Sequence, residues 1–426
     1  YSGPFSPSSS IVVGWRNTIQ RKGNRMNSDM ESFTGDLSRM WKLQERPPLN
    51  HLTWDWWWWL LMLDDENGNP SGKQLMVLWS TKDNSKVTVS NTVWEPKGRP
   101  GFDKESGIAL DGMVCAWWYD GKRMHEPLIK RKCRIITMDD THSKWPSDAE
   151  NSGRGGGAVV PLLEDDLSMG LKSDLSEFWL NLTSDEQPIP GMVPKKMKFQ
   201  ITPWNDAMST ARHATATYAM NMGYDILRLH GCKVKGSLDD KHVKGTAYFQ
   251  KVCVQAPSVP WYWGVLHLDD GSYIDWFLPH LSFTITARDN RPWKRRDLSH
   301  ISLSQGGLFH DAKNNRSEKF THVEIEKEIS NLSEGKHGHH PGAPLPSFSV
   351  KMSNENTSIS LRVDAVDRAH WTFEQPTRGG LTSHFTYNEY PLEAKYLKIV
   401  DETGTRTHND YAWIRGNAEH SWGLLH

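Results

Sequence analysis

Two tryptophan-rich segments carry the side chains that could act on an apolar molecule. The segment 54–68 reads WDWWWWLLMLDDENG, and the segment 261–271 reads WYWGVLHLDDG. Because alternate side chains of a strand share a face, Asp55 is expected on the same face as Trp57 and Trp59. A carboxyl group among indole rings either bonds to a buried partner or becomes easier to protonate through the loss of water. Asp55 is therefore a candidate proton donor, and a structural aspartate bonded to the backbone is the alternative.

Three further polar side chains stand where they could give a hydrogen bond to a bound molecule. Tyr248 and Gln250 alternate together in one run, and His267 shares the face of Trp261 and Trp263 in the next. Together with the aspartate named above, they are the predicted catalytic residues. The predicted substrate-binding residues are the indoles that would line the site, namely Trp56, Trp57, Trp58, Trp117, Trp261, Trp263 and Trp276. The alternative is that these rings only fill the protein interior.

Signatures of several common enzyme classes are missing from the sequence. There is no G-x-S-x-G, no H-E-x-x-H, no G-x-x-x-x-G-K and no G-x-G-x-x-G after a predicted strand. Catalysis by a serine triad, phosphoryl transfer and hydride transfer are therefore not indicated, and no cofactor is expected. The loop 333–346 holds His337, His339 and His340 between glycines and prolines, without a carboxylate at ligand spacing, so no metal site is expected either.

The two tryptophan segments superpose on one another without a gap. The pattern W-x-W-x4-L-D-D occurs at residues 56–65 and again at 261–270, followed in both cases by a glycine-containing turn. This repeat predicts a tandem of two related β units in which the two segments occupy equivalent strand positions. Two domains are also what the length of 426 residues favours. We divide the chain into an irregular leader, an N-terminal barrel, a connecting segment and a C-terminal barrel, at residues 1–48, 49–200, 201–222 and 223–426.

The rest of the chain mostly has the alternation that is typical of strands. Runs such as LMVLWS, KVTVSNTVW, CRIITM and SISLRVDA alternate apolar and polar residues and are separated by turns. A hairpin is expected about Asp239 and Asp240. Helical periodicity is scarce, and its best candidates are 167–180 and 206–222. The prediction is an all-β chain that forms two tandem antiparallel β-barrels with a few short helices.

The balance of charge argues against nucleic acid or a charged membrane surface as a partner. The chain has 50 basic and 51 acidic residues, so no large field of one sign is expected. No apolar run approaches the roughly 18 residues needed to span a bilayer. A small apolar or aromatic molecule is the expected partner.

Several features favour a secreted protein or one of the secretory pathway, with the cytoplasm as the alternative. The chain starts at Tyr1 rather than Met, which indicates processing or trimming. Cys115 and Cys133 are nearly equidistant from the turn 120–127, as the partners of a cross-strand disulfide would be, and free buried thiols are the alternative. Four glycosylation acceptors of the type N-x-S/T occur, at Asn181, Asn315, Asn331 and Asn356.

These residues resemble a known family. The segment 55–68 is similar, position for position, to the E-W-W-Y-x-x-G-H-L-x-D-x-x-G hallmark of the AttH-like, hydroxyneurosporene-synthase-like proteins, with Asp55 at the acidic position. Their second hallmark, V-x-G-x-x-Y followed by W-x-W and a D-G turn, is similar to residues 243–248, 261–263 and 270–271. The resemblance covers both predicted barrels, and it implies that they are lipocalin-like.

The resemblance also implies two kinds of activity, because the superfamily includes carotenoid 1,2-hydratases and fungal lipocalin-like Diels–Alderases. The hydratases carry D-H-x-W after the tyrosine and an aspartate on the next strand, whereas this chain has FQKVC at 249–253 and WFL at 276–278. We therefore predict a cofactor-free cyclase that performs a Diels–Alder or hetero-Diels–Alder reaction on a polyene or terpenoid intermediate, through orientation and one hydrogen bond. A proton-transferring hydratase or isomerase and a passive binder of an apolar ligand are the alternatives.

Overall fold

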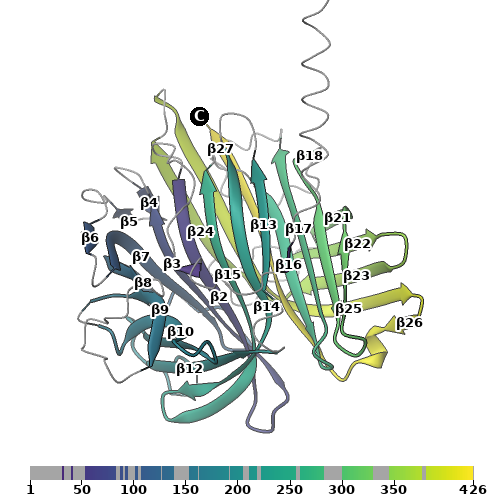
Figure 1. Ribbon diagram of the computed structural model, residues 1–426, viewed down its shortest axis with the longest axis horizontal. Coiled ribbons are helices and arrows are strands. Elements are labelled where there is room, and N and C mark those ends of the chain that lie inside the picture. Colours follow the sequence, from purple (N-terminus) through teal and green to yellow (C-terminus); the bar gives the residue numbers. More distant parts are fainter. Residues whose placement is uncertain are drawn as a thin grey trace, which may run out of the picture.

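The computed structural model is built almost entirely from β-strands (Figure 1). The only helix whose bounds lie within the described part of the chain is the 3-10 turn η5, His408–Asp410. No helix there is long and apolar enough to cross a membrane. The structure describes residues 31–32, 40–41, 53–82, 87–89, 92–94, 101–103, 107–125, 127–138, 153–161, 163–190, 192–204, 211–217, 222–255, 260–282, 300–329, 345–376 and 380–425.

Ten strands of the first sheet close into an antiparallel barrel. The ring closes where β15 pairs on one side with β14 and on the other with β2. In order around the ring, the strands are β14 (Gly223–Leu238), β12 (Lys196–Pro203), β11 (Phe178–Thr183), β10 (Leu167–Lys172), β9 (Arg154–Val159), β8 (Ile129–Met138), β7 (Gly107–Tyr119), β3 (Pro70–Lys82), β2 (Thr53–Asp64) and β15 (Lys241–Gln255). Three short strands extend this sheet, namely β1 (Glu31–Ser32), β13 (Ala211–Thr217) and β6 (Gly101–Asp103).

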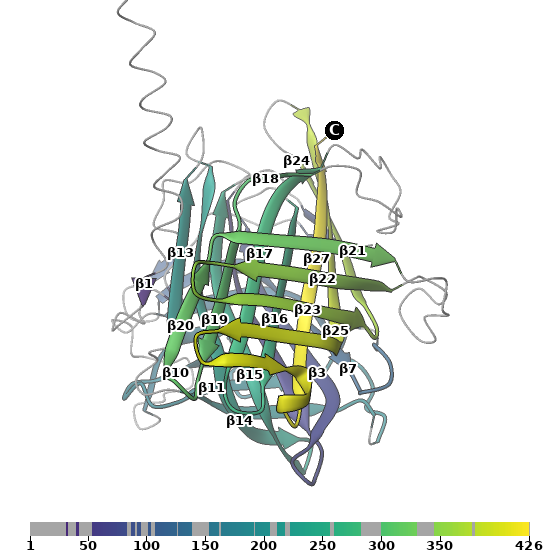
Figure 2. The ribbon, with the colours of Figure 1, turned by 90° about the vertical axis from the view of Figure 1, so that its right-hand side faces the viewer.

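Nine strands form a second antiparallel barrel that is nearly closed. In order, they are β20 (Arg316–Phe320), β19 (Gly306–Asp311), β17 (Tyr273–Ser282), β16 (Trp261–Leu268), β27 (Ile414–Leu425), β25 (Thr382–Asp401), β23 (Ser358–Ala365), β22 (Pro346–Ser353) and β21 (His322–Ile329). Figure 2 shows β21, β22 and β23 running across the direction of β16, β17 and β27, as expected when a sheet curls on itself. The short strands β18 (His300–Ser302), β24 (Ala369–Pro376) and β26 (Gly404–Thr407) add to its edges.

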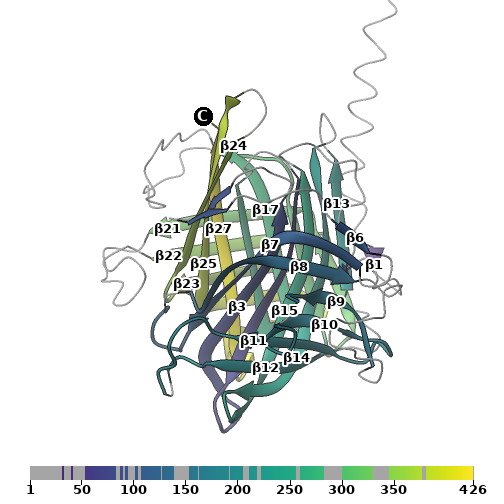
Figure 3. The ribbon, with the colours of Figure 1, turned by 90° about the vertical axis from the view of Figure 1, so that its left-hand side faces the viewer.

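The two barrels are packed against one another (Figure 3). The hairpin of β4 (Val87–Val89) and β5 (Thr92–Trp94), from the first half of the chain, pairs with β24 of the second barrel. Polar contacts also cross between the barrels: Arg415 Nη1 donates to Asp64 Oδ1 at 2.6 Å, and Gln74 Nε2 donates to the carbonyl of Gly416 at 2.9 Å. The barrels therefore share a junction held by both strand pairing and side chains.

Strand alternation sorts most of the large side chains into three main cores. In β2, the odd-numbered residues enter the first barrel, whereas Trp58 and its even-numbered neighbours face the second barrel. In β16, Leu266 and Leu268 enter the second barrel, whereas Trp263 and Val265 face the first. The predicted strand positions of the two tryptophan repeats are thus confirmed, and so is the separation of Trp58 from Asp55 and Trp57.

The two predicted helices are wrong. Residues 167–180 form β10, a turn and the start of β11. Leu175, which contributed to the helical spacing, stands in that turn with φ of 60° and is 48% exposed. Within 206–222, the described residues include β13, which pairs with β14. Cross-strand pairing, rather than local periodicity, determines both segments.

The division of the chain between the two sheets differs from the expected one. Residues 223–255, which we assigned to the second barrel, form β14 and β15 and complete the first sheet. The segment 201–222, expected as a connection, supplies the end of β12 and all of β13. Within the leader, Met40 and Trp41 are buried in the first core. The repeat marks equivalent strands, but it does not reveal which barrel the intervening hairpin joins.

The predicted disulfide is wrong because the hairpin of β7 and β8 has a different register. Gly112 lies opposite Cys133, and Lys130 lies opposite Cys115. The two cysteines face different cores, since Cys115 belongs to the core between the barrels and Cys133 packs against the first. All four cysteines are free thiols.

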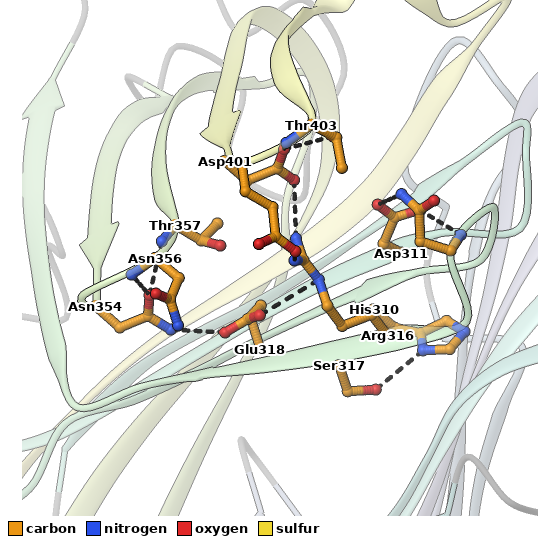
Figure 4. Close-up of polar contacts among 12 residues, drawn as sticks. His310, Asp311, Arg316, Ser317, Glu318, Asn354, Asn356, Thr357, Asp401 and Thr403 are labelled. Atoms are coloured by element: carbon orange, nitrogen blue, oxygen red, sulfur yellow. Dashed lines mark hydrogen bonds and ion pairs between the residues drawn. The ribbon is translucent and has the colours of Figure 1, made fainter.

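One end of the second barrel is held by a network of charged side chains (Figure 4). Arg406 Nη1 donates to Asp311 Oδ2 at 2.9 Å, and Arg316 Nη2 donates to Asp401 Oδ2 at 3.1 Å. Both aspartate side chains are fully buried. These contacts join the turn between β19 and β20 to the turn between β25 and β26. Because each cation is matched by carboxylates, we interpret the network as structural.

Candidate functional site at the junction of the barrels

The two tryptophan segments meet face to face between the barrels. Trp56 of β2 stacks on Trp261 of β16 with ring centroids 6.4 Å apart and planes inclined by 17°. Further along both strands, Trp58 meets Trp263 edge to face at 5.4 Å. Trp117 of β7 lies in the same core. The structure therefore brings together five of the predicted substrate-binding residues, and we call these five rings the aromatic seam.

One end of the aromatic seam reaches the surface. Trp56 and Trp261 are half-buried, as is the neighbouring Trp54, whereas Trp58 and Trp263 are only 1% and 2% exposed. A molecule that approaches from solvent would therefore meet indole rings first.

Two predicted substrate-binding residues lie elsewhere. Trp57 is inside the first barrel, where its Nε1 donates to the carbonyl of Met40 at 2.5 Å. Trp276 is inside the second barrel and packs so closely on Gly264 that a Cβ there would come within 2.0 Å of the ring. Both rings fill barrel interiors, as the alternative interpretation of the sequence held.

Asp55 also faces away from the aromatic seam. It forms a buried ion pair with Lys251 of the neighbouring strand β15. The ammonium group of Lys251 also lies 5.3 Å from the ring centroid of Trp57. A carboxylate held by a buried cation suits a structural role, so the geometry favours that alternative, with Lys251 rather than the backbone as the partner.

His267 is fully engaged by neighbouring groups. Its Nε2 is 2.6 Å from the carbonyl of His230, and its Nδ1 is 2.9 Å from Thr246 Oγ1. Since a carbonyl only accepts, Nε2 carries the hydrogen and Nδ1 accepts from the threonine. Burial lowers the pKa of His267 to about 3, so the ring is neutral at physiological pH. Neither nitrogen remains for a substrate.

Tyr248 and Gln250 are the predicted catalytic residues that the structure places at the aromatic seam. The Tyr248 ring lies 4.9 Å from Trp263 and 5.9 Å from Trp58. Its hydroxyl donates to Gln250 Oε1 at 3.2 Å. Burial raises the pKa of Tyr248 well above its ordinary value, so the phenol stays neutral.

The structure adds a pair of buried glutamates that the sequence analysis missed. Glu389 of β25 and Glu419 of β27 are direct cross-strand partners and are 0% and 2% exposed. The Tyr387 hydroxyl lies within hydrogen-bonding distance of both carboxyls, and Trp261 Nε1 donates to Glu419 Oε2 at 2.6 Å. Because one hydroxyl hydrogen cannot serve two carboxylates, the pair needs a proton of its own.

The pKa values of the two glutamates agree with a pair that holds a proton of its own. Burial raises the pKa of Glu419 to about 7, although hydrogen bonds from Glu389 and Trp261 act in the opposite direction. Burial also raises the pKa of Glu389 well above its ordinary value, and the charge of Glu419 raises it further. Glu389 is therefore the carboxyl that keeps its proton, and Glu419 is the one that titrates near neutral pH.

A second charged group lies beside Trp263. Asp275 of β17 accepts a hydrogen bond from Trp263 Nε1 at 3.1 Å, and it lies 3.6 Å from both Arg228 Nη1 and His230 Nε2. Burial raises the pKa of Asp275, but the charge of Arg228 and the polar contact with His230 outweigh it, so the pKa is lowered. Asp275 thus stays ionised. Asp275 lies one residue before the segment 276–278, where the family pattern led us to expect an acid.

This arrangement can move protons next to an apolar surface. A group whose pKa lies near the working pH can both donate and accept a proton, and Glu419 meets that condition. Its hydrogen bond to Trp261 ties it directly to the aromatic seam. The site is therefore suited to proton exchange with an apolar molecule held against indole rings.

The described part of the chain offers no ready metal centre. No group of three or more potential metal-ligating side chains occurs there. The tract with His337, His339 and His340 lies outside the described residues. The expectation that the protein uses no metal and no cofactor stays a prediction.

Fold and site together define an all-β protein of two packed antiparallel barrels with titratable groups at their junction. No family model matches the chain. A levanase of Bacillus sp. (strain L7) is 24% identical over 162 residues, which are 37% of this chain and only 17% of the levanase.

Two solved structures align with most of the chain at low sequence identity. A protein from Nitrosomonas europaea described as a candidate AttH is 13% identical, with 87% of this chain and 92% of that chain covered and a TM-score of 0.44. OpdQ of Pseudomonas aeruginosa is 9% identical, with 88% and 96% covered and a TM-score of 0.10. At these values neither structure bears on function, and the description of the fold rests on the strand pairing itself.

Proposed function

We propose that this protein is a proton-transfer enzyme that acts on an unsaturated apolar molecule at the junction of its two barrels. The observation that carries the proposal is the buried pair of Glu389 and Glu419, which needs a proton and is hydrogen-bonded to Trp261 of the aromatic seam. Burying two carboxyl groups side by side is unfavourable, so such a pair beside an apolar contact surface points to a chemical role.

Glu419 is the proposed general acid–base group. In its ionised form it accepts a proton from the carbon next to a double bond, and as an acid it returns a proton to the far carbon of that double bond. The double bond moves by one position, and no atom is gained or lost overall. Glu389 keeps its own proton and donates to Glu419, which favours the ionised form of Glu419 at the start of the cycle. The aromatic seam would hold the molecule by apolar contact.

A cofactor-free cycloaddition of a polyene or terpenoid is the second candidate. The observation that favours it is the indole N–H of Trp58, which is buried in the aromatic seam without a hydrogen-bond partner among the described residues. A Diels–Alder or hetero-Diels–Alder reaction requires orientation and one such donor, but no titrating group. Passive binding of an apolar ligand is the remaining alternative and would leave the ligand unchanged.

Deuterium incorporation separates these three functions. The purified protein is incubated in D₂O with geraniol, farnesol or geranylgeraniol, and the recovered molecules are examined by mass spectrometry for deuterium bound to carbon. Proton transfer through Glu419 adds deuterium, a cycloaddition gives a new ring without it, and a binding protein returns the compounds unlabelled. Failure to label any of the three alcohols would contradict proton transfer to isoprenoids of this kind.

Two variants make the test specific to the buried pair. Glu419→Gln should lower the labelling rate on the order of 100-fold or more, because its amide cannot exchange a proton at neutral pH. Glu393→Gln is the matched control, since Glu393 lies on β25, the strand of Glu389, but is exposed, and labelling should be unchanged. Full labelling by Glu419→Gln would refute its role.

A further inference from the structure

A row of hydrogen-bond donors lies on the side of the junction that the first barrel provides. Arg228 of β14 lies directly opposite Gln250 of β15, and Gln250 lies directly opposite Trp58 of β2. Residues directly opposite one another in a sheet project from the same face. These three side chains, which we call the donor row, are buried, with exposures of 4%, 7% and 1%.

The donor row lacks protein acceptors. Arg228 Nε and Trp58 Nε1 are buried without a hydrogen-bond partner among the described residues. Gln250 uses its side-chain oxygen to accept from Tyr248, and its amide N–H groups meet no acceptor in the described part of the chain. Buried donors are normally paired, and unpaired ones destabilise a fold. Two neighbouring buried donors in this condition, with the Gln250 amide between them, point to an acceptor supplied by a ligand.

Arg228 is held in place without being satisfied. Its Nη1 lies 3.6 Å from Asp275 Oδ1, which is an electrostatic contact longer than an ordinary hydrogen bond. Its guanidinium carbon lies 5.2 Å from the ring centroid of Phe277. The cation is therefore fixed at the junction while its Nε–H group has no acceptor among the described residues.

The charges around the donor row select the kind of acceptor. Asp275 lies beside Arg228, and Glu419 is close enough to influence the ionisation of both. An anionic ligand would meet these carboxyl groups, whereas a neutral oxygen would meet only donors. The flanking rings of Tyr248 and Trp263 favour a planar group. A conjugated carbonyl group is neutral and planar, and its oxygen accepts two hydrogen bonds.

We infer that the donor row binds the carbonyl oxygen of a neutral conjugated ketone or aldehyde of isoprenoid type. The inference rests on the proposed function and names its substrate class. Glu419 removes a proton from the carbon beyond the last conjugated double bond, and the electron pair moves along the conjugated system onto the carbonyl oxygen, where Arg228 and Gln250 stabilise it. Glu419 then returns a proton to the carbon next to the carbonyl, which shifts the double bond and restores the neutral carbonyl.

The probe for this inference is β-ionone carrying ¹³C at its carbonyl carbon. Isotope-edited infrared difference spectra isolate the carbonyl stretch of the bound ketone. Bound to the wild-type protein, this stretch should lie at lower wavenumber than in an apolar solvent, because hydrogen bonds weaken the C=O bond. Deuterium exchange of the bound ketone in D₂O is measured in the same samples.

Three variants and a control assign the effect to the donor row. Gln250→Leu and Arg228→Met should each weaken β-ionone binding roughly tenfold or more and move the carbonyl stretch towards its position in apolar solvent. Arg228→Met leaves Asp275 without its cation and could impair folding, so Trp58→Phe, which keeps an aromatic ring and removes only the N–H group, provides an independent variant. Arg134→Met is the control, because Arg134 has a 41% exposed side chain and should leave both readouts unchanged.

The outcomes distinguish this inference from the proposed function. No detectable binding of β-ionone, an unshifted carbonyl stretch, or equal affinity in wild type, Gln250→Leu and Trp58→Phe would overturn the role of the donor row. A shifted stretch without any deuterium exchange would support the donor row and refute the proton transfer by Glu419. Deuterium exchange of isoprenoid alcohols together with an unshifted carbonyl stretch of the bound ketone would support proton transfer by Glu419 and refute the role of the donor row.

Discussion

Replacing Glu419 by glutamine should change how the stability of the protein depends on pH. Burial raises the pKa of Glu419 from 4.5 to about 7. A carboxyl group with a raised pKa binds its proton more tightly in the folded state. Its contribution to stability is therefore complete below the unfolded pKa and is lost as the pH rises through the folded pKa. At about 1.4 kcal/mol per unit, this loss amounts to about 3 kcal/mol between about pH 4.5 and pH 7.

His267 should oppose this trend in the wild-type protein. Burial lowers its pKa from 6.5 to about 3. Only the unfolded chain takes up a proton at this site just below pH 6.5, so stability is lost as the pH falls below that value. From about pH 6.5 down to about pH 4.5 the loss is again about 3 kcal/mol. The two effects oppose one another in the wild type, and Glu419→Gln should remove the contribution of Glu419 while that of His267 remains.

Urea unfolding from about pH 4.5 to about pH 8 measures this directly. The free energy of unfolding of Glu419→Gln minus that of the wild type should rise by about 3 kcal/mol across the window and level off above about pH 7. Groups that do not interact with Glu419, His267 included, cancel in this difference. Glu393→Gln should run parallel to the wild type. A difference that stays constant with pH would refute the reasoning that the buried pair holds a proton.

Three further predictions concern the fold. Lys251→Met should destabilise the protein by about 3–5 kcal/mol in urea unfolding, because Asp55 would stay buried without its cation. Adding Asp55→Asn should recover part of that loss. An unchanged unfolding midpoint in Lys251→Met would exclude the ion pair. Gly264→Ala should cost about 1–3 kcal/mol and lower Tm, since its Cβ would lie 2.0 Å from the Trp276 ring, whereas an unchanged Tm would mean that the ring moves freely. Thiol titration of the unfolded, unreduced protein should find four free thiols, and its intact mass shows whether the glycans of the predicted secretory location are present.

Features encoded by neighbouring residues were predictable from the sequence. Period-2 alternation places Trp56 and Trp58 on one face of a strand and Asp55 on the other, and no knowledge of the partner strands is needed. The ungapped repeat likewise places Trp261 and Trp263 at the corresponding strand positions. That the two aromatic faces pack on one another, with Trp56 stacked on Trp261, is a finding of the structure and was not predicted.

Features that depend on register were not predictable in this way. Cys115 and Cys133 are nearly equidistant from a turn in sequence, yet the hairpin pairs them with Lys130 and Gly112, and the two thiols face different cores. The hairpin of residues 223–255 precedes the second tryptophan strand in the chain, yet it closes the first barrel. Nothing within these segments specifies the strand that they will meet, because the choice depends on long-range pairing.

The buried glutamates show how far one sequence signal reaches. In β25, alternation puts Glu389 on the same face as the aromatic Phe385 and Tyr387, which is the same signal that drew attention to Asp55 among the tryptophans. The two acids differ only in what the neighbouring strand brings to them. Asp55 meets the ammonium of Lys251, whereas Glu389 meets the carboxyl of Glu419, thirty positions further along the chain. A shift of one residue in register would turn Glu419 to the other face of the sheet. The sequence therefore identifies a buried acid, but only strand pairing decides whether that acid becomes a structural ion or keeps its proton near neutral pH.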